Sequence, residues 1–222
     1  MNPVTRTLIA KELYLHRWTM LGMAVAAALA AGLCAFGRLA FNVGAIAWIT
    51  AVIAGGVMLA IYGVGQERRD NSLQFVLSLP ISPRQYVLAK LAGLLLAYLL
   101  PWLVAAGSAA LLVVLSTAIP DGMLAYVAVL SGFLLANFGV VLAGALLVRS
   151  EGAMTAVIIV TNMGVSIFMF VVGALPGIRD HLGDPAPVWN TTILAVLLAE
   201  ALVLASALLL PLLSAARRRD FL

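Results

Sequence analysis

The chain has 222 residues, of which 64% are hydrophobic and 10% are charged, and its formal net charge is +4. Soluble proteins contain about 45–50% apolar and about 25% charged residues, and a soluble fold could not keep this much apolar surface from water. The composition excludes soluble enzymes, nucleic-acid binders and disordered proteins, and it predicts an integral membrane protein. The single cysteine, Cys34, excludes an internal disulfide and a metal site built from cysteines.

The segment 3–17 precedes the first long apolar stretch. Val4, Leu8 and Leu15 share one helical face, but Lys11 lies among them, so the amphipathic stripe is imperfect. The residues leave two interpretations for this segment, a helix at the membrane interface or a continuation of the first span. The apolar stretch that follows is longer than the 7–15 residues of a signal-peptide core, so we expect it to be retained.

Six stretches reach the length of about 20 apolar residues that a transmembrane helix needs. They are Trp18–Phe36, Val43–Val64, Val87–Ala118, Met123–Val148, Ala153–Leu175 and Ile193–Leu213. The third stretch is too long for one bilayer, so we expect its first part to project into water. The prediction is an all-α protein with a single transmembrane domain over residues 1–222 and six spans.

Lysine and arginine residues gather on one side of this predicted bundle. With six spans, one side carries Arg6, Lys11, Arg17, Arg68, Arg69, Arg84, Lys90, Arg149, Arg217, Arg218 and Arg219. Only Arg38 and Arg179 lie on the other side. Because cytoplasmic loops are rich in Lys and Arg, both termini are predicted to face the cytoplasm. The positive charge is thus a sign of topology, and it does not indicate a nucleic-acid partner.

The connection between the second and third spans, residues 66–86, is the most informative part of the sequence. Asp70 or Asn71 can cap a short helix, which Pro80 would end. The apolar residues on one face of this helix are Leu73, Val76 and Leu77. The pattern is typical of a membrane-surface hairpin, or of an element onto which a cytoplasmic protein docks.

A second helix start follows directly. Ser82 is placed to cap it, Pro83 suits the first helical position, and Gln85 completes a capping box. This helix is predicted to continue into the third span, which explains the excess length of that span. A force on the short helix would then be transmitted to the third span through this continuous helix.

The stretch from about Tyr62 to Pro101 resembles permeases of type-2 ABC exporters. The residues that carry the resemblance are Glu67, the pair Ser72-Leu73, the pair Leu79-Pro80, the run Ser82-Pro83-Arg84 and Lys90. The family usually has glycine before the Ser-Leu pair, where this chain has Asn71. The resemblance implies six spans, an interfacial helix before the first span and a coupling helix between the second and third. The haem-exporter permease of cytochrome maturation is a nearby relative.

The resemblance also implies partners. Two permease subunits, which we expect to be identical, would pair in the bacterial inner membrane, and each would bind a cytoplasmic ATPase subunit. ATP and Mg would bind to that ATPase, while this chain would hold no cofactor or metal and would not be an enzyme. The residues implied to couple to the ATPase are Glu67, Arg68, Arg69, Asp70, Leu73, Val76, Leu77 and Leu79. A solvated loop that only sets the topology is the alternative for the charged members.

Glu200 lies near the middle of the sixth predicted span. A charged carboxylate there costs several kcal/mol unless it is paired, protonated or hydrated. Its candidate partners are Asn137, Thr161, Asn162 and Ser166. We interpret these five residues as a candidate substrate pathway, with a plain hydrogen bond between helices as the alternative.

The external segment 176–192 begins with Pro176 and Gly177, which break a helix. In the family that the chain resembles, this connection re-enters the membrane as an outer gate. An ordinary external loop with Trp189 at the interface is the alternative. Small residues at four-residue spacing are predicted to pack helices closely, chiefly within one subunit. These pairs are Gly22 and Ala26, Gly56 and Ala60, and Gly139 and Ala143.

The function predicted from these observations is the permease of an ATP-driven exporter. It would move an amphiphilic or hydrophobic substrate out of the cytoplasm by alternating access. A haem-type exporter of cytochrome maturation is one alternative. An alternative from another class is a self-contained secondary transporter or channel, with Glu200 as its proton or ion site, or a membrane scaffold, each of which would work without an ATPase.

Overall fold

The computed structural model describes residues 3–65, 82–148 and 150–217, and within these ranges every regular element is a helix. The all-α fold is thereby confirmed for the described residues. The elements are α1 (Pro3–Leu15), α2 (Arg17–Leu33), α3 (Arg38–Ala60), the π-helical segment η1 (Ile61–Gly65), α6 (Pro83–Leu115), α7 (Met123–Leu147), α8 (Glu151–Ala174), α9 (Pro176–Arg179) and α10 (Thr191–Arg217).

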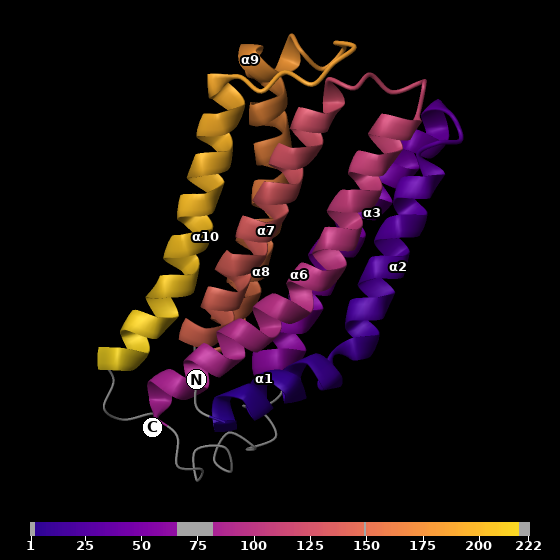
Figure 1. The fold of residues 1–222 in the computed structure, drawn as a ribbon. Coiled ribbons are helices and arrows are strands. Elements are labelled where there is room, and N and C mark those ends of the chain that lie inside the picture. Colours follow the sequence, from indigo (N-terminus) through magenta and orange to yellow (C-terminus); the bar gives the residue numbers. More distant parts are fainter. Residues whose placement is uncertain (1–2, 66–81, 149, 218–222) are drawn as a thin grey trace.

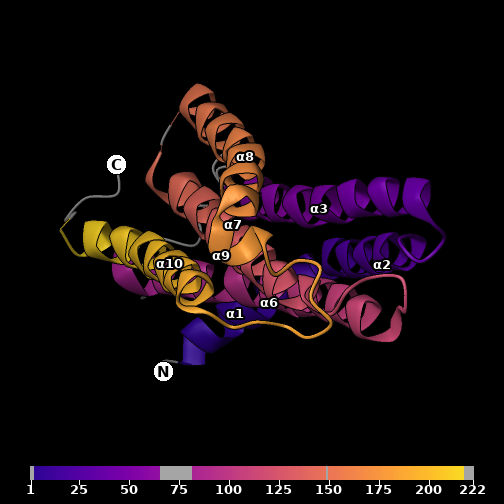
Figure 2. The same ribbon diagram turned by 90° about the horizontal axis from the view of Figure 1, so that it is seen from above.

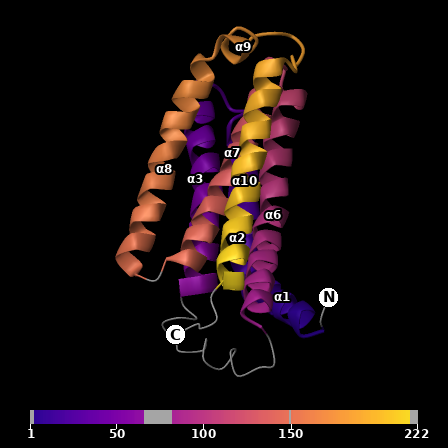
Figure 3. The ribbon, with the colours of Figure 1, turned by 90° about the vertical axis from the view of Figure 1, so that its left-hand side faces the viewer.

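The long helices α2, α3, α6, α7, α8 and α10 lie side by side and alternate in direction (Figures 1 and 3). The connections at 34–37, 116–122 and 148–150 are short, which forces the helices that they join to run antiparallel. Helix α1 lies across one end of this bundle, and α9 covers the other (Figure 1). The start of α1 and the end of α10 consequently lie at the same end.

Five helical segments are long and apolar enough to cross a membrane. They are Arg38–Gly65, Arg84–Leu115, Met123–Leu147, Glu151–Ala174 and Thr191–Ala215. The first predicted span is shorter, because α2 has 17 residues and is therefore about 25 Å long, against a hydrocarbon core of about 30 Å. It is cut from α1 at His16, and the chain turns at Gly37, whose φ is 100°. The count of six spans stays a prediction.

Helix α6 begins with the predicted capping box. The Ser82 amide donates to the Gln85 side-chain oxygen at 2.9 Å, and the Gln85 amide donates to the Ser82 hydroxyl at 3.3 Å. Pro83 occupies the first helical position, as expected. The helix then runs for 33 residues, which is about 50 Å and exceeds the thickness of a hydrocarbon core.

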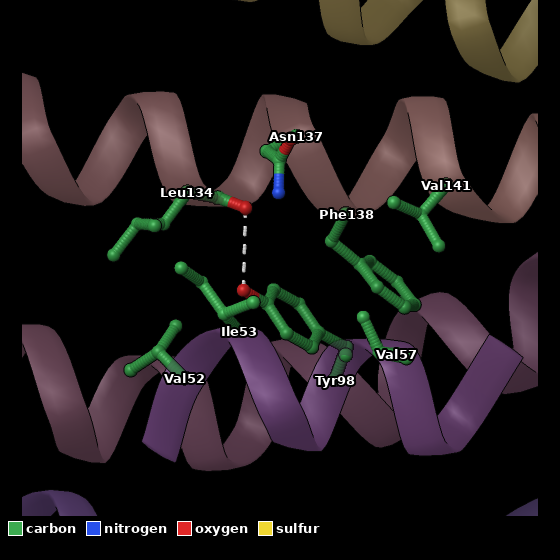
Figure 4. A pocket seen from close by; sticks show the side chains of 9 residues that line it. Val52, Ile53, Val57, Tyr98, Leu134, Asn137, Phe138 and Val141 are labelled. Atoms are coloured by element: carbon green, nitrogen blue, oxygen red, sulfur yellow. Dashed lines mark hydrogen bonds between the residues drawn. The ribbon is translucent and has the colours of Figure 1, made fainter. Parts of the chain in front are cut away.

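Aromatic side chains hold α3, α6 and α7 together in the middle of the bundle. Tyr98 stacks on Phe138 with ring centroids 3.9 Å apart, and its hydroxyl donates to the Leu134 carbonyl at 3.2 Å (Figure 4). A Cβ on Gly56 would lie within 3.1 Å of both rings, so glycine permits this approach. The Trp48 indole further donates to the Ala105 carbonyl at 3.0 Å and ties α3 to α6.

Glycines also let α7 and α10 approach closely. A Cβ on Gly139 would lie 2.6 Å from the Leu204 side chain and 3.7 Å from Ala207. The predicted close packing within one subunit is thus confirmed at this position and at Gly56. Gly22, by contrast, has nothing within 4 Å of a built Cβ.

The segment 176–192 lies over the end of the bundle that α9 covers (Figure 1). Ile178 is buried there against Ile193 of α10. The Asn190 side chain accepts from the Ile193 amide at 3.0 Å, which caps α10, and it donates to the Gly177 carbonyl. The connection is thereby anchored to the helix that follows it, and its entry into the membrane stays a prediction.

Helix α8 stands at the outside of the bundle, away from α2 and α10 when seen from above (Figure 2). Its exposed apolar side chains are Ile159, Val160, Met163, Ile167, Phe170 and Val171. Such a surface would be covered by a partner in a soluble protein. In a bilayer the lipid tails satisfy it, which agrees with the apolar length of this helix.

Candidate functional site

The residues implied to couple to an ATPase, from Glu67 to Leu79, lie outside the described residues. The two points at which that segment joins the bundle are described, namely the end of η1 at Gly65 and the capped start of α6 at Ser82. Both lie at the end of the bundle where α1 lies (Figure 1). The structure around these two points is therefore where a force on the segment would arrive.

A buried lysine connects three elements at this end. Lys90 of α6 is 3% exposed, and its ammonium donates to Glu12 Oε1 of α1 at 2.7 Å. It also donates to the Gly63 carbonyl of η1 at 2.7 Å. Glu12 is itself 2% exposed, so both charges of the pair are withdrawn from solvent.

The backbone of η1 and glycines of η1 and α6 permit the contact of Lys90 with Glu12 and Gly63. In a π-helical turn the hydrogen bonds no longer follow the α-helical pattern, and the Gly63 carbonyl receives the lysine ammonium. A Cβ on Gly63 would come within 2.8 Å of the Leu94 side chain. A Cβ on Gly93 would lie 2.9 Å from the Glu12 side chain. Two glycines therefore let α1 and η1 reach α6.

His16 lies beside the pair and is also buried. Its Nε2 is 3.6 Å from Glu12 Oε2, which is longer than a hydrogen bond. Burial by itself raises the pKa of the Glu12 carboxyl, but His16 and the Lys90 ammonium outweigh it and hold that pKa below its ordinary value. Glu12 is thus an ionised, paired carboxylate at neutral pH.

Sequence reasoning included Lys90 but missed Glu12. The buried polar residues in and directly after α1 are Thr5, Glu12 and His16, and they follow each other at spacings of seven and four, so they share one face. That polar face, and not the stripe of Val4, Leu8 and Leu15, packs on the bundle. The signal in the sequence was that Glu12 is an acidic residue in a segment whose other charged residues, Arg6, Lys11 and Arg17, are basic.

The other candidate site is Glu200 of α10, which is 7% exposed. Its side chain lies against α7, where a Cβ on Gly132 would overlap Oε2. Among the described residues neither carboxylate oxygen has a hydrogen-bond partner. Glu200 therefore makes no hydrogen bond to the candidate partners Asn137, Thr161, Asn162 and Ser166 within the described residues, because α10 turns this side chain onto the glycine face of α7. The role of these residues in a substrate pathway stays a prediction.

The four expected partners lie elsewhere. Asn137 points into a cavity between α3, α6 and α7 (Figure 4). Thr161 donates to the Val157 carbonyl of its own helix at 2.8 Å. Asn162 has a buried side-chain oxygen without a partner among the described residues, and Ser166 is exposed on α8. The structure does not bring these residues and Glu200 together within one subunit.

The cavity beside Asn137 measures about 10 Å³, which is room for roughly one water molecule. It is lined by apolar side chains and by Tyr98, whose hydroxyl is already bonded to Leu134 (Figure 4). An organic cargo does not fit this space.

Comparison with known proteins decides the family. The family model described as "ABC-2 family transporter protein" matches residues 23–205, which is more than half of the chain. This chain belongs to the ABC-2 transporter family. It is accordingly a permease, a multi-pass membrane subunit of an ABC transporter, and the predicted resemblance to type-2 ABC permeases is confirmed. Comparison with curated proteins gives no match.

ABC-2 permeases normally work with an ATPase subunit, which gives the end of the bundle near Gly65 and Ser82 its significance. Lys90 and Glu200 both lie inside the matched range, whereas Glu12 precedes it. The tie between Lys90 and Glu12 therefore joins the family domain to an N-terminal helix outside the match. The match does not single out the haem exporters.

Proposed function

We propose that this ABC-2 permease is the membrane subunit of an ATP-driven exporter, and that segment 66–81 is the element on which the ATPase acts. The single observation that carries the proposal is the buried tie at Lys90. The ammonium holds η1, where the segment leaves, to α6, where the segment returns, and holds both to α1. A displacement of the segment would then move three elements together.

The proposal extends to the assembly. Because the cavity beside Asn137 has room for about one water molecule and therefore does not hold an organic substrate, we propose that the substrate path forms between two copies of the permease. Each copy would bind one ATPase at the end of the bundle that carries α1. ATP binding would draw the two ATPases together and switch the permease pair between inward-facing and outward-facing states. The apolar helices favour an amphiphilic or hydrophobic cargo.

We propose the orientation of the permease in the membrane from the distribution of its Lys and Arg residues. The end of the bundle that carries α1 would face the cytoplasm of a bacterial inner membrane, because most Lys and Arg residues belong to that side. The opposite end, with α9 and the Asn190 cap, would face outward. In this orientation the long α6 would project toward the ATPase.

Co-purification tests the docking. The tagged permease would be extracted from its native membrane in mild detergent, beside a Leu77→Arg variant that puts a charge on the proposed docking face. The control is Ala118→Arg, which adds the same charge to an exposed loop at the opposite end. We expect an ABC ATPase with the wild type and the control, and its loss with Leu77→Arg. A preparation without ATPase that still transports under an ion gradient would overturn the exporter proposal.

A further inference from the structure

Glu200 has no role in the proposed coupling, yet its surroundings are unusual. It is a carboxyl group in the tenth position of α10, 7% exposed, and it lies over Gly132 of α7. Neither oxygen has a hydrogen-bond partner among the described residues. Further along the contact between α7 and α10, the side chain of Leu204 of α10 lies over Gly139 of α7 in the same manner. The Glu200 carboxyl thus packs on a glycine of α7 as the apolar Leu204 side chain does.

No opposite charge is available to it from the elements that pack against α10, which are α6, α7 and α9. Helix α7 contains no charged residue, and its one titratable side chain is Tyr126. On α6 the Lys90 ammonium is bound to Glu12 and Gly63, and the Tyr98 hydroxyl to Leu134, while Arg84 and Tyr86 lie in its first turns. Helix α9 contributes Arg179, which is exposed at the end of the bundle.

The ligand that suits such a group is a proton. An unpaired carboxylate in the membrane interior costs several kcal/mol, and the neutral acid removes that cost. A metal cation would need about six oxygen ligands, and the described residues contain no cluster of three or more His, Cys, Asp or Glu side chains. Glu200 has no second ligand beside it between α7 and α10 among the described residues, so the proton is the simplest cation that it can bind.

We propose that Glu200 is a proton-binding site between α7 and α10, protonated while the two helices are packed and deprotonated when they separate. On separation the carboxyl O–H bond breaks and the proton passes to water that enters the seam. Packing of the helices again would take up one proton in each subunit. This inference goes beyond the proposed function and does not depend on it.

Dicyclohexylcarbodiimide tests for the bound proton, because this apolar reagent reacts with protonated carboxyl groups in membranes. The acid O–H adds across one C=N bond, and rearrangement gives a stable N-acylurea that mass spectrometry detects on the peptide. In native membranes we expect Glu200 to be labelled near neutral pH and its labelling to be lost as the pH is raised. The buried Glu12, an ionised partner of Lys90, serves as the internal control and should stay unlabelled.

Stability gives a second readout that does not depend on access of the reagent. Glu200→Gln is the neutral counterpart of the protonated acid, and position 200 in this variant no longer titrates. A free Glu carboxyl loses its proton above about pH 4.3, whereas the packed protein would keep it, so the unfolded wild type binds fewer protons than the folded one. The Tm of the wild type in detergent should therefore fall relative to that of Glu200→Gln as the pH rises from about 5 through neutrality. A difference in Tm between the two proteins that stays constant over this pH range, or a wild type that gains stability over the variant as the pH rises, would overturn the proposal.

Discussion

The Lys90 ammonium contacts two acceptors that come from different parts of the chain, and both bonds are buried. The carboxylate of Glu12 is 78 residues away in sequence, and the Gly63 carbonyl is 27 residues away. Removal of one member of a buried ion pair leaves an uncompensated charge, whereas replacement of both by apolar groups is often tolerated. The contribution of the pair is therefore best measured by comparing single and double substitutions.

We expect Lys90→Met to destabilise the permease by about 3–5 kcal/mol, because Glu12 would be left buried without its cation. The double variant Lys90→Met with Glu12→Leu should recover much of this loss. Thermal unfolding in one detergent would measure both. Arg6→Met, which removes an exposed cation of α1, is the control and should change stability by less than about 0.5 kcal/mol. Equal losses in the single and double variants would contradict the pairing.

The pH dependence at Glu12 follows from its lowered pKa. In the folded protein this carboxyl titrates below its ordinary value of 4.5, so between the two values the unfolded chain binds more protons. The stabilisation is complete above about pH 4.5 and is lost as the pH falls through the folded-state pKa. Thermal unfolding between pH 7 and pH 3 should show this loss in the wild type, and Glu12→Gln should flatten that part of the curve.

At the scale of elements, glycines decide which helices approach each other. A Cβ on Gly44 of α3 would lie 2.6 Å from the Ala30 carbonyl oxygen of α2, and backbone atoms cannot move aside as a flexible side chain can. Gly132 and Gly139 act similarly for α10 on α7, although there they face side chains. In a bilayer such close packing replaces the hydrophobic effect as the main attraction between helices.

We expect Gly44→Ala to destabilise the permease by about 1–3 kcal/mol, because the methyl group forces α2 and α3 apart. Gly22→Ala is the matched control, since it lies on α2 and has open space around a built Cβ. The control should leave the Tm unchanged or raise it slightly, because alanine favours helix over glycine. Similar Tm values for the two variants would show that α2 and α3 do not pack in this way.

At the scale of the whole molecule, we expect α2 to cross the membrane although it is short. The long helices alternate in direction, and α1 and the end of α10 lie at one end (Figure 1). Helix α2 is shorter than a hydrocarbon core, so it needs local thinning of the bilayer or help from flanking residues.

Single cysteines would settle the topology. Cys34 is free and buried, so it would first be changed to Ser. Cysteines in place of Arg6, Arg38, Ala118 and Gly152, which are all exposed, would then be tested in sealed cells with an impermeant maleimide. We expect labelling from outside at 38 and 118, and at 6 and 152 only after permeabilisation. Labelling of 6 and 38 from the same side would show that α2 does not cross.

The sequence by itself determined the class of protein, the long helices, the start of α6 at the Ser82 capping box and the resemblance to type-2 ABC permeases. These features depend on composition and on neighbours within a few residues, so they can be predicted without the fold. The coupling role of the segment from Glu67 to Leu79 stays a prediction.

Only the tertiary structure decided that Glu12 pairs with Lys90 and that Glu200 lies over Gly132 instead of meeting Asn137 or the polar residues of α8. The physical reason is that a membrane helix is apolar on every side. Hydrophobic periodicity, which tells the buried face of a soluble helix, then carries little information about which face meets a neighbour. The packing of small residues decides that instead, through contacts between residues distant in sequence.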